Sequence, residues 1–386
     1  MKISIIVGGR FHAFNLAEQL NQKNYLKQLI TSYPKFYIND KFKIDGKLIK
    51  SFFLKEVLQR SFFNRLFNID DYLTEYFDYR ASSNLDFDDL DILIGWSSFS
   101  YRSFLKAKNK KCISVLERGS THIEYQNQIL IEEYKLLKLR PKKISKHIIE
   151  KEKKEYELAD YIMVPTEYAK KTFLDKGFSD KKIIKNHYGV DLKEFNYDRD
   201  QKEKNPKFRI IYAGTISVRK GIIYLLEAFN QLDLENSELM LIGDIEKDLT
   251  SRLNKYKKNK KIVFKKSMKQ SDLKKYYNIS DVFVLNSIED GFGMVILQAM
   301  ACGLPVITSQ NTGGSEIIED DKNGYIIPIR SLEILKKKIS FLYNNPKRCF
   351  EMGMIAKEKV NSKYSWESYG KRQIDLYLSI LKNKYK

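Results

Sequence analysis

The chain has 386 residues, 43% hydrophobic content and a formal net charge of +20. This length exceeds what a single core usually organises, so we expect two domains. No apolar stretch approaches the roughly 18 residues of a transmembrane helix, which argues against an integral membrane protein. Cys112, Cys302 and Cys349 lie far apart, with no metal-ligand spacing and no disulfide framework, so the cytoplasm is the expected compartment.

The positive charge has several candidate partners. Nucleic acid, an anionic membrane and a phosphorylated substrate would each suit it. A lysine-rich surface that is simply solvated is the alternative.

Short apolar runs alternate with helical patterns along the whole chain. The first run, residues 2–8, is too short for a signal peptide and predicts a core strand. The alternation predicts an α/β protein with parallel sheets in two units, and the polar, charged segment 197–208 is the expected linker. The predicted strands are 2–8, 28–33, 91–96, 112–118 and 160–166 in the first unit, and 208–214, 239–243, 261–266, 281–287, 304–309 and 324–329 in the second.

The first candidate site follows the first predicted strand. Gly8 and Gly9 come between this strand and a helix, so the backbone can approach a ligand and the helix N-terminus can face an anion. A dinucleotide fingerprint would need a third spaced glycine, so a tight turn is the alternative.

The second candidate site lies in the stretch "YAGTISVRKGIIYLLEAF". Gly214 ends a strand, and Arg219 and Lys220 precede a helix. Two cations at a helix N-terminus oppose the helix dipole, and a bound anion would reverse that cost. A diphosphate fits, because arginine binds bidentately and lysine supplies a compact charge. Two solvated cations are the alternative.

The third candidate site is the stretch "DGFGMVILQAMACGLPVIT". Asp290 precedes a helix predicted to begin near Gly293, where it could act as an N-cap. Gly291 and Gly293 leave bare amides there, which suit an anion. Gln298 follows roughly two turns later, where it could line a cleft or sit partly buried.

These stretches resemble the GT-B glycosyltransferases, specifically the retaining nucleotide-sugar enzymes of glycosyltransferase family 4. The resemblance also includes "NHYGVDLKEF", "TGGSEIIEDDKNGYIIP" and "YSWESYGKRQIDLY", in the family's order. It implies two facing Rossmann-like domains with a central cleft. Residues 1–195 would form the acceptor domain, joined by a C-terminal helix at 366–386, and 206–365 the donor domain.

The resemblance also implies roles for single residues. Arg219 and Lys220 would hold the donor diphosphate, and Asp290 would contact the donor sugar. Gln298 would bind the ribose hydroxyls. The nucleotide-binding set is completed by Gly9, Gly214, Gly291, Phe292 and Gly293, and Glu316 would match an acidic residue near the cleft wall.

The sequence departs from the family pattern at three positions. Thr215 replaces the usual arginine after the strand-end glycine, and Asp290 and Gln298 stand where the family has glutamates. Moving the register by one residue does not restore two acids, because Glu289 plus eight is Leu297. A glutamine can still accept from one hydroxyl and donate to the other.

A histidine near the reacting centre is also implied. His122 follows a predicted strand of the acceptor domain, with Glu117 and Arg118 beside it, and is the expected catalytic histidine. His12 lies at another strand-end loop. A purely structural role is the alternative, since isolated histidines are often structural.

The expected activity is retaining transfer of a hexosyl or related sugar. The donor would be a UDP or GDP type nucleotide sugar, and the acceptor a surface glycan or glycolipid, as in lipopolysaccharide or capsule synthesis. The leaving phosphate could take the acceptor proton, so neither a metal nor another cofactor is expected. The sugar, the nucleobase and the acceptor stay open.

Residues 46–67 interleave aromatic and basic side chains. At helical spacing, Phe52, Phe53, Phe63, Leu66 and Phe67 share one face, which would suit peripheral attachment to the inner face of the plasma membrane. An ordinary packed helix is the alternative.

Two rival functions stay open. A catalytically weak GT-B protein could act as an assembly partner, an idea motivated by Gln298 and Thr215. A nucleic-acid binder rests on charge alone and has no recognisable module, so nucleic acid is not an expected partner.

Overall fold

Two parallel β-sheets organise the chain, and the computed structural model describes residues 1–67, 69–198, 200 and 207–384. Runs such as Ile3–Val7 and Val282–Leu285 are buried along their whole length, as expected for strands covered by helices on both faces. The strands are β1 (Ile3–Val7), β2 (Leu26–Thr31), β3 (Ile49–Ser51), β4 (Ile92–Trp96), β5 (Ile113–Glu117), β6 (Tyr161–Val164), β7 (Ile183–Lys185), β8 (Phe208–Ala213), β9 (Ser237–Ile242), β10 (Ile262–Lys265), β11 (Val282–Leu285), β12 (Val306–Ser309) and β13 (Gly324–Ile327).

The sheet orders are those of doubly wound folds. The first sheet runs β3-β2-β1-β4-β5-β6-β7 and the second β10-β9-β8-β11-β12-β13, and all pairings within them are parallel. Strand order reverses between β1 and β4 in the first sheet, and between β8 and β11 in the second. Ligands bind such sheets beyond the carboxyl ends of the strands at the point of reversal.

Every strand predicted from the sequence overlaps an observed one, and the α/β prediction is confirmed. The edge strands β3 and β7 were not predicted. Each has only three residues, which is too short to show a periodic pattern. Most of the predicted linker, at 199 and 201–206, lies outside the described residues.

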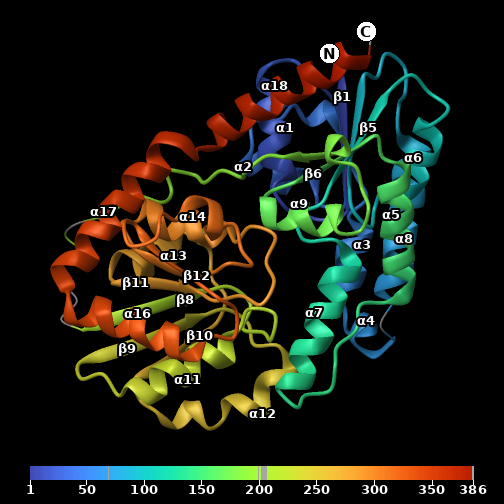
Figure 1. Cartoon of the computed structure of the whole chain (residues 1–386). Coiled ribbons are helices and arrows are strands. Elements are labelled where there is room, and N and C mark those ends of the chain that lie inside the picture. The colour runs from blue at the N-terminus through green and yellow to red at the C-terminus, as the bar shows by residue number, and fades with distance from the viewer. Residues whose placement is uncertain (68, 199, 201–206, 385–386) are drawn as a thin grey trace.

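Helices cover both faces of each sheet (Figure 1). They are α1 (Ala13–Gln22), α2 (Lys35–Lys41), α3 (Leu54–Arg60), α4 (Phe62–Phe67), α5 (Asp70–Asn84), α6 (Tyr101–Ala107), α7 (Ile123–Leu136), α8 (Lys146–Leu158), α9 (Glu167–Leu174), α11 (Ile222–Leu232), α12 (Thr250–Leu253), α13 (Gln270–Asn278), α14 (Met294–Ala301), α15 (Gly314–Ile317), α16 (Leu332–Asn344), α17 (Pro346–Lys363) and α18 (Trp366–Lys384), with 3-10 turns at Gly46–Leu48, Asp180–Lys182, Lys247–Leu249 and Tyr256–Lys258.

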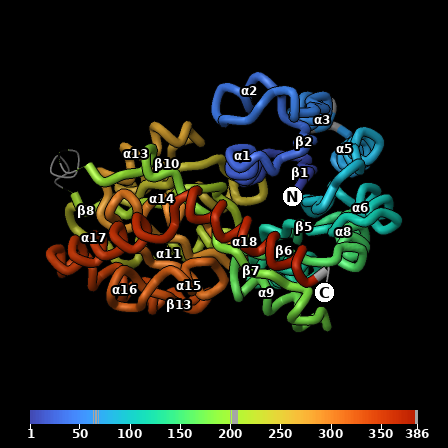
Figure 2. Tube along the Cα trace, turned by 90° about the horizontal axis from the view of Figure 1, so that it is seen from above, coloured from blue at the N-terminus to red at the C-terminus, as the bar shows by residue number. Residues whose placement is uncertain are grey.

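The last two helices join the two units. α17 packs on α14 and α16 of the second unit, and α18 crosses to pack on α1 of the first, as Figures 1 and 2 show. Gly370 of α18 lies so close to Gln19 of α1 that a Cβ at Gly370 would meet its side chain. The predicted crossing helix is therefore present.

The predicted continuous aromatic face is wrong. The segment forms β3, α3 and α4 in succession, so a single helical register does not run through it. Phe53 and Phe67 are 53% and 63% exposed, whereas Phe52 packs against the core. The side chains of Phe63 and Leu66 lie outside the described residues. None of the described helices has the length and apolar character of a membrane span.

Candidate active site

A cleft lies between the carboxyl ends of the two sheets and has two chambers. The first has a volume of about 570 Å³ and the second about 960 Å³. Phe11 from the first unit and Met294 from α14 line both chambers and so mark the boundary between them. The cleft stands where both switch points place a ligand.

One wall of the first chamber carries an ion pair. The Lys220 ammonium donates to Oδ2 of Asp290, and both residues line the chamber together with Gly214. Asp290 is only 8% exposed, and its backbone N–H donates to the Asn311 carbonyl at 3.0 Å. Gly293 has a φ of 78°, a left-handed conformation that allows α14 to start beside this pair.

The residue before Asp290 is the centre of a second, denser network. Glu289 is fully buried, and its Oε2 accepts from Arg219 Nε at 2.7 Å and from Gln126 Nε2 at 2.9 Å. Its Oε1 accepts from the Ser120 hydroxyl at 2.7 Å and the Thr121 hydroxyl at 2.9 Å. Four charged or polar side chains from both units therefore meet around one carboxylate.

This environment keeps both Glu289 and Arg219 ionised. Burial raises the pKa of Glu289, but the Arg219 charge and the hydrogen bonds from Ser120 and Gln126 outweigh it, so the pKa falls to about 2. Burial lowers the pKa of Arg219, and the charges of Glu289 and Asp290 more than reverse this effect. The cleft wall therefore holds a permanent cation beside Lys220.

The opposite wall comes from the first unit. Arg118 bonds Glu152 and donates to Gln126 Oε1 at 2.9 Å, while the Ser98 hydroxyl donates to Glu152 at 2.6 Å. Ser98 has a φ of 75°, and its N–H donates to Glu155 at 2.6 Å, which holds this unusual turn in place. The wall thus presents hydroxyl, guanidinium and carboxylate groups that suit a polyhydroxylated ligand.

His122 does not lie in this cleft, which corrects the prediction that it is the catalytic histidine. Its ring packs among Tyr156, Phe173 and Phe178, and its Nδ1 accepts from the Glu124 N–H as the N-cap of α7. Burial lowers its pKa to about 4, so the ring is neutral at physiological pH. These contacts are those of a structural side chain.

His12 lines the first chamber instead. Its ring stacks near Trp96 and Tyr188, with centroids 5.1 Å and 4.1 Å away. Its Nε2 lies 3.4 Å from Glu117 Oε2 but makes no hydrogen bond within the described part of the chain. A buried imidazole nitrogen that makes no hydrogen bond is a candidate contact for a ligand.

Gln298 lies in the second chamber, away from Asp290. Its Oε1 accepts from the Tyr277 hydroxyl at 3.4 Å, and it lines the chamber with Gln270 and Ser271 of α13. The two positions of the predicted motif therefore face different chambers, with Met294 between them.

The remaining predicted residues divide into two groups. Phe292 and Gly293 line the first chamber with Gly214. Gly9 and Gly291 are not among the residues that line either chamber. Gly291 instead packs against the Gly119 carbonyl of the first unit, where a Cβ would clash, so its glycine serves contact between the units.

Glu316 also serves that contact and does not line the cleft. Its Oε2 lies 2.9 Å from Lys185 Nζ and 3.2 Å from His187 Nε2, both in the first unit. This position differs from the predicted one near the cleft wall. Glu289, by contrast, was not among the predicted site residues.

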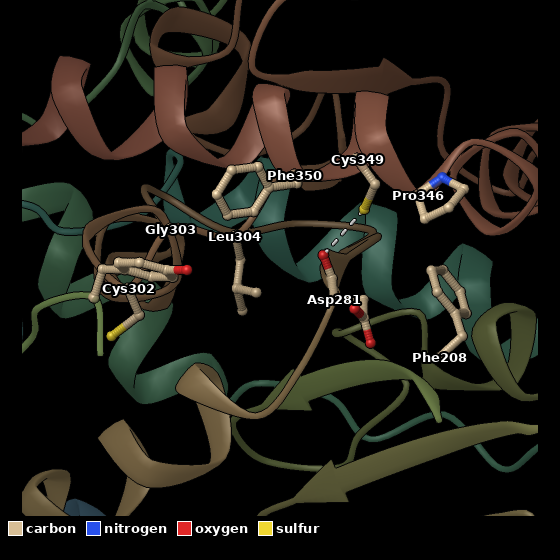
Figure 3. Close-up of a pocket in the computed structure, with 9 residues that line it drawn as sticks. Phe208, Asp281, Cys302, Gly303, Leu304, Pro346, Cys349 and Phe350 are labelled. Carbon is tan, nitrogen blue, oxygen red and sulfur yellow. Dashed lines mark hydrogen bonds between the residues drawn. The ribbon is translucent and has the colours of Figure 1, made fainter. Parts of the chain in front are cut away.

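A third cavity of about 100 Å³ shares no lining residue with the cleft (Figure 3). Cys302 and Cys349 line it, and the Cys349 thiol donates to the Asp281 carbonyl at 3.3 Å. Burial raises the pKa of Cys302 to about 12, which makes it a poor nucleophile. Among the described residues, no group of three or more His, Cys, Asp or Glu side chains could hold a metal ion.

Comparisons with known proteins point to one family. Residues 194–359 match the family model described as glycosyl transferases group 1. The lipopolysaccharide 1,2-N-acetylglucosaminetransferase of Salmonella typhimurium is 32% identical over 177 residues, which cover 42% of this chain and 46% of that protein. The capsular polysaccharide biosynthesis glycosyltransferase CapM of Staphylococcus aureus is 27% identical over 205 residues, 50% of this chain and 53% of that protein. The chain thus spans about half the length of these curated relatives.

Solved structures resemble the whole chain. Sucrose-phosphate synthase from Thermosynechococcus elongatus superposes with a TM-score of 0.74 and 17% identity, covering 99% of this chain and all of that one. HepE from Anabaena, in complex with UDP, gives a TM-score of 0.70 and 14% identity, covering 98% of this chain and all of that one. These likenesses establish the GT-B fold.

Proposed function

We propose that this protein transfers a sugar from a nucleotide-diphosphate sugar to a glycan acceptor, because residues 194–359 match the family model described as glycosyl transferases group 1, in a chain with the GT-B fold. The observation that carries this proposal is the first chamber's wall, where Arg219, Lys220 and Asp290 meet beside the start of α14. Two cations and a helix N-terminus suit a diphosphate, and a carboxylate suits the sugar hydroxyls.

The donor would occupy both chambers. The diphosphate and sugar would lie in the first, against Arg219 and Lys220, and the nucleoside in the second, where Gln298 would face the ribose. Gln298 has one amide oxygen and one amide nitrogen, so it can bind two hydroxyls. The UDP bound to HepE supports a UDP type donor, and a GDP type donor is the second possibility.

The proposed transfer retains the configuration at the sugar's C1. The bond from C1 to the diphosphate oxygen breaks, with its electron pair going to the diphosphate. An acceptor hydroxyl then bonds C1 from the same face, and its proton passes to the leaving phosphate. Arg219 and Lys220 would stabilise the charge that develops on that phosphate.

The proposal includes no metal ion, because Arg219 and Lys220 supply the positive charge that the diphosphate needs. Activity is therefore expected to persist in excess EDTA. Loss of activity in EDTA, with recovery on adding Mg²⁺, would contradict this part of the proposal.

The acceptor would be a surface glycan, which would contact the wall formed by Arg118, Ser98 and Glu152. Relatives named for capsule and lipopolysaccharide synthesis support this acceptor class. A lipid-linked form of it would place the protein at the cytoplasmic face of the membrane, as a peripheral protein.

A thermal-shift panel of UDP, GDP, ADP and dTDP sugars tests the donor site, since a ligand that binds the folded state raises its melting temperature. Release of nucleotide diphosphate then tests transfer. Lys220→Ala and Asp290→Ala are expected to abolish release, whereas Lys146→Ala, at the exposed start of α8, should leave it unchanged. Binding of none of the sugars would overturn the proposal. Binding without any transfer would favour a GT-B protein that acts as an assembly partner.

A further inference from the structure

We propose that Glu289 is a positioning residue, which aims Arg219 at the donor diphosphate only while the two units are in contact. This inference rests on the function proposed above. It assigns a role to a residue that lines neither chamber of the cleft.

Glu289 binds one edge of the Arg219 guanidinium. Arg219 Nε donates to Glu289 at 2.7 Å, and Nη2 donates to the Ser120 hydroxyl at 3.3 Å. Across the described ranges of the chain, Nη1 makes no hydrogen bond, and the Arg219 side chain lines the first chamber with 34% of its surface exposed. Glu289 thus holds one edge of the fork and leaves the other for a ligand.

A backbone hydrogen bond keeps Glu289 beside Arg219. The N–H of Ile288 donates to the Arg219 carbonyl at 2.9 Å, which joins the segment after β11 to the segment before α11. Glu289 and Arg219 are therefore neighbours within the second unit. Their pairing does not depend on the first unit, but the remaining bonds of the carboxylate do.

The remaining bonds of the Glu289 carboxylate come from the first unit. Ser120, Thr121 and Gln126 all belong to the first unit, and among the described residues they supply every other donor to the Glu289 carboxylate. If the units separated, the carboxylate would lose these donors and be free to turn toward water. A buried carboxylate is costly unless such donors satisfy it. The orientation of Arg219 is therefore coupled to contact between the units.

A simple interdomain contact would look different, and the chain supplies one for comparison. Glu316 also belongs to the second unit and bonds Lys185 and His187 of the first. It touches neither Arg219 nor the cleft chambers. Glu316→Gln is therefore a matched control for Glu289→Gln.

The first measurement needs no ligand. In protein labelled with ¹⁵N-arginine, the Arg219 Nε–H should give an NMR signal protected from solvent exchange, assigned by its loss in Arg219→Ala. Glu289→Gln should reduce this protection, because a neutral amide oxygen is a weaker acceptor than a carboxylate, and Glu316→Gln should keep it. Unchanged protection in Glu289→Gln would overturn the inference.

The second measurement is a double-mutant cycle on the dissociation constants of UDP and GDP. Loss of a charge-assisted phosphate contact in Arg219→Ala should weaken binding about 30-fold, and misdirection of the fork in Glu289→Gln about tenfold. The double variant should be no weaker than Arg219→Ala alone, because Glu289 acts through Arg219. The losses of Glu316→Gln and Arg219→Ala should instead multiply. Melting temperatures identify variants that fail to fold.

The outcomes separate the two proposals. Multiplied losses for Glu289→Gln and Arg219→Ala, in a protein that binds UDP or GDP, would overturn the role of Glu289 and leave the proposed function standing. Failure of the unaltered protein to bind either nucleotide would overturn the donor site and, with it, this inference.

Discussion

At the scale of single residues, His12 and His122 follow strands of the same sheet but have opposite surroundings. His12 lines the first chamber, and His122 is sealed among aromatic rings. We expect His12→Asn to lower kcat/KM about 30-fold with little change in melting temperature, because a side chain that lines the first chamber is lost. His122→Asn should lower the melting temperature and leave kcat/KM per folded molecule unchanged. The reverse pattern would restore the role predicted for His122.

The raised pKa of Glu155 predicts how the free energy of unfolding depends on pH. Burial, followed by the charge of Glu152, raises its pKa to about 8, although it accepts the Ser98 and Ser100 N–H groups. The unfolded chain loses this proton near the ordinary value of 4.5, so folding stability falls as pH rises from 4.5 to about 8. Each unit of pKa difference is worth about 1.4 kcal/mol, so the loss should amount to a few kcal/mol.

Urea unfolding between pH 5 and 9 measures this effect. Glu155→Gln cannot ionise, so its free energy of unfolding should change less across that range than that of the unaltered protein. Parallel curves for the two proteins would show that Glu155 is already ionised in the folded state.

The sequence identified residues within one segment better than partners from distant segments. Arg219, Lys220 and Asp290 were predicted from strand ends and helix starts, and they do share a chamber. Glu289 could not be predicted as a site residue, because its environment includes Ser120, which lies 169 residues away in the chain. His122 was chosen over His12 because position after a strand does not reveal which way a side chain turns.

At the scale of elements, α7 connects the cleft to the far end of the second unit (Figure 1). Near its C-terminal end, Glu133 is fully buried and accepts from the Tyr224 hydroxyl at 2.8 Å and from Arg330 Nε at 2.6 Å. Beyond its end, the Leu137 carbonyl accepts from Arg252 at 2.6 Å. α7 thus helps to fix the distance between the units.

Neighbouring acids on α7 test this role. Glu133→Ala should lower the free energy of unfolding by about 3 kcal/mol, because it strips a partner from the buried end of Arg330. Glu132→Ala removes an exposed acid that bonds the same arginine at 2.8 Å, and it should cost less than about 1 kcal/mol. Equal losses in the two variants, measured by urea unfolding, would argue against a special role for the buried acid.

The elements themselves were largely readable from sequence because their apolar periods are strong. α11 and α13 fall in the predicted helical segments, and α14 begins one residue after Gly293. The prediction for the aromatic segment 46–67 was wrong because the spacing of its aromatic residues fits one helix, whereas the chain divides the segment into β3, α3 and α4. Spacing alone does not reveal where a helix stops.

At the scale of the whole molecule, the two units are held by separate sets of contacts. They include the Glu289 network in the cleft, Glu316 with Lys185 and His187, the end of α7, and α18 on α1. The chain length and the alternation of strands and helices predicted two units, and the family resemblance predicted the crossing helix. The sequence could not predict the other contacts, because each joins residues that are far apart in the chain.

The surface of the first unit supports a final prediction about membranes. Phe53, Val57, Phe62 and Tyr72, on or beside α3, α4 and α5, are 53%, 55%, 73% and 78% exposed. Arg60 of α3 is 69% exposed near them, and the chain's net charge is +20. Apolar side chains beside cations suit the boundary of an anionic bilayer, where both the apolar area and the charge contribute to binding.

Sedimentation with liposomes measures this binding. Vesicles with anionic lipid should pull the protein down, neutral vesicles much less, and added salt should weaken the effect because it screens the charges. Phe62→Ser should reduce binding, since a largely exposed aromatic ring is removed from the contact. Phe350→Ser is the matched control, because Phe350 is 47% exposed but belongs to α17 of the second unit. Equal partition into anionic and neutral vesicles would contradict an electrostatic contribution, and equal losses in the two variants would show that the first unit's surface is not the contact.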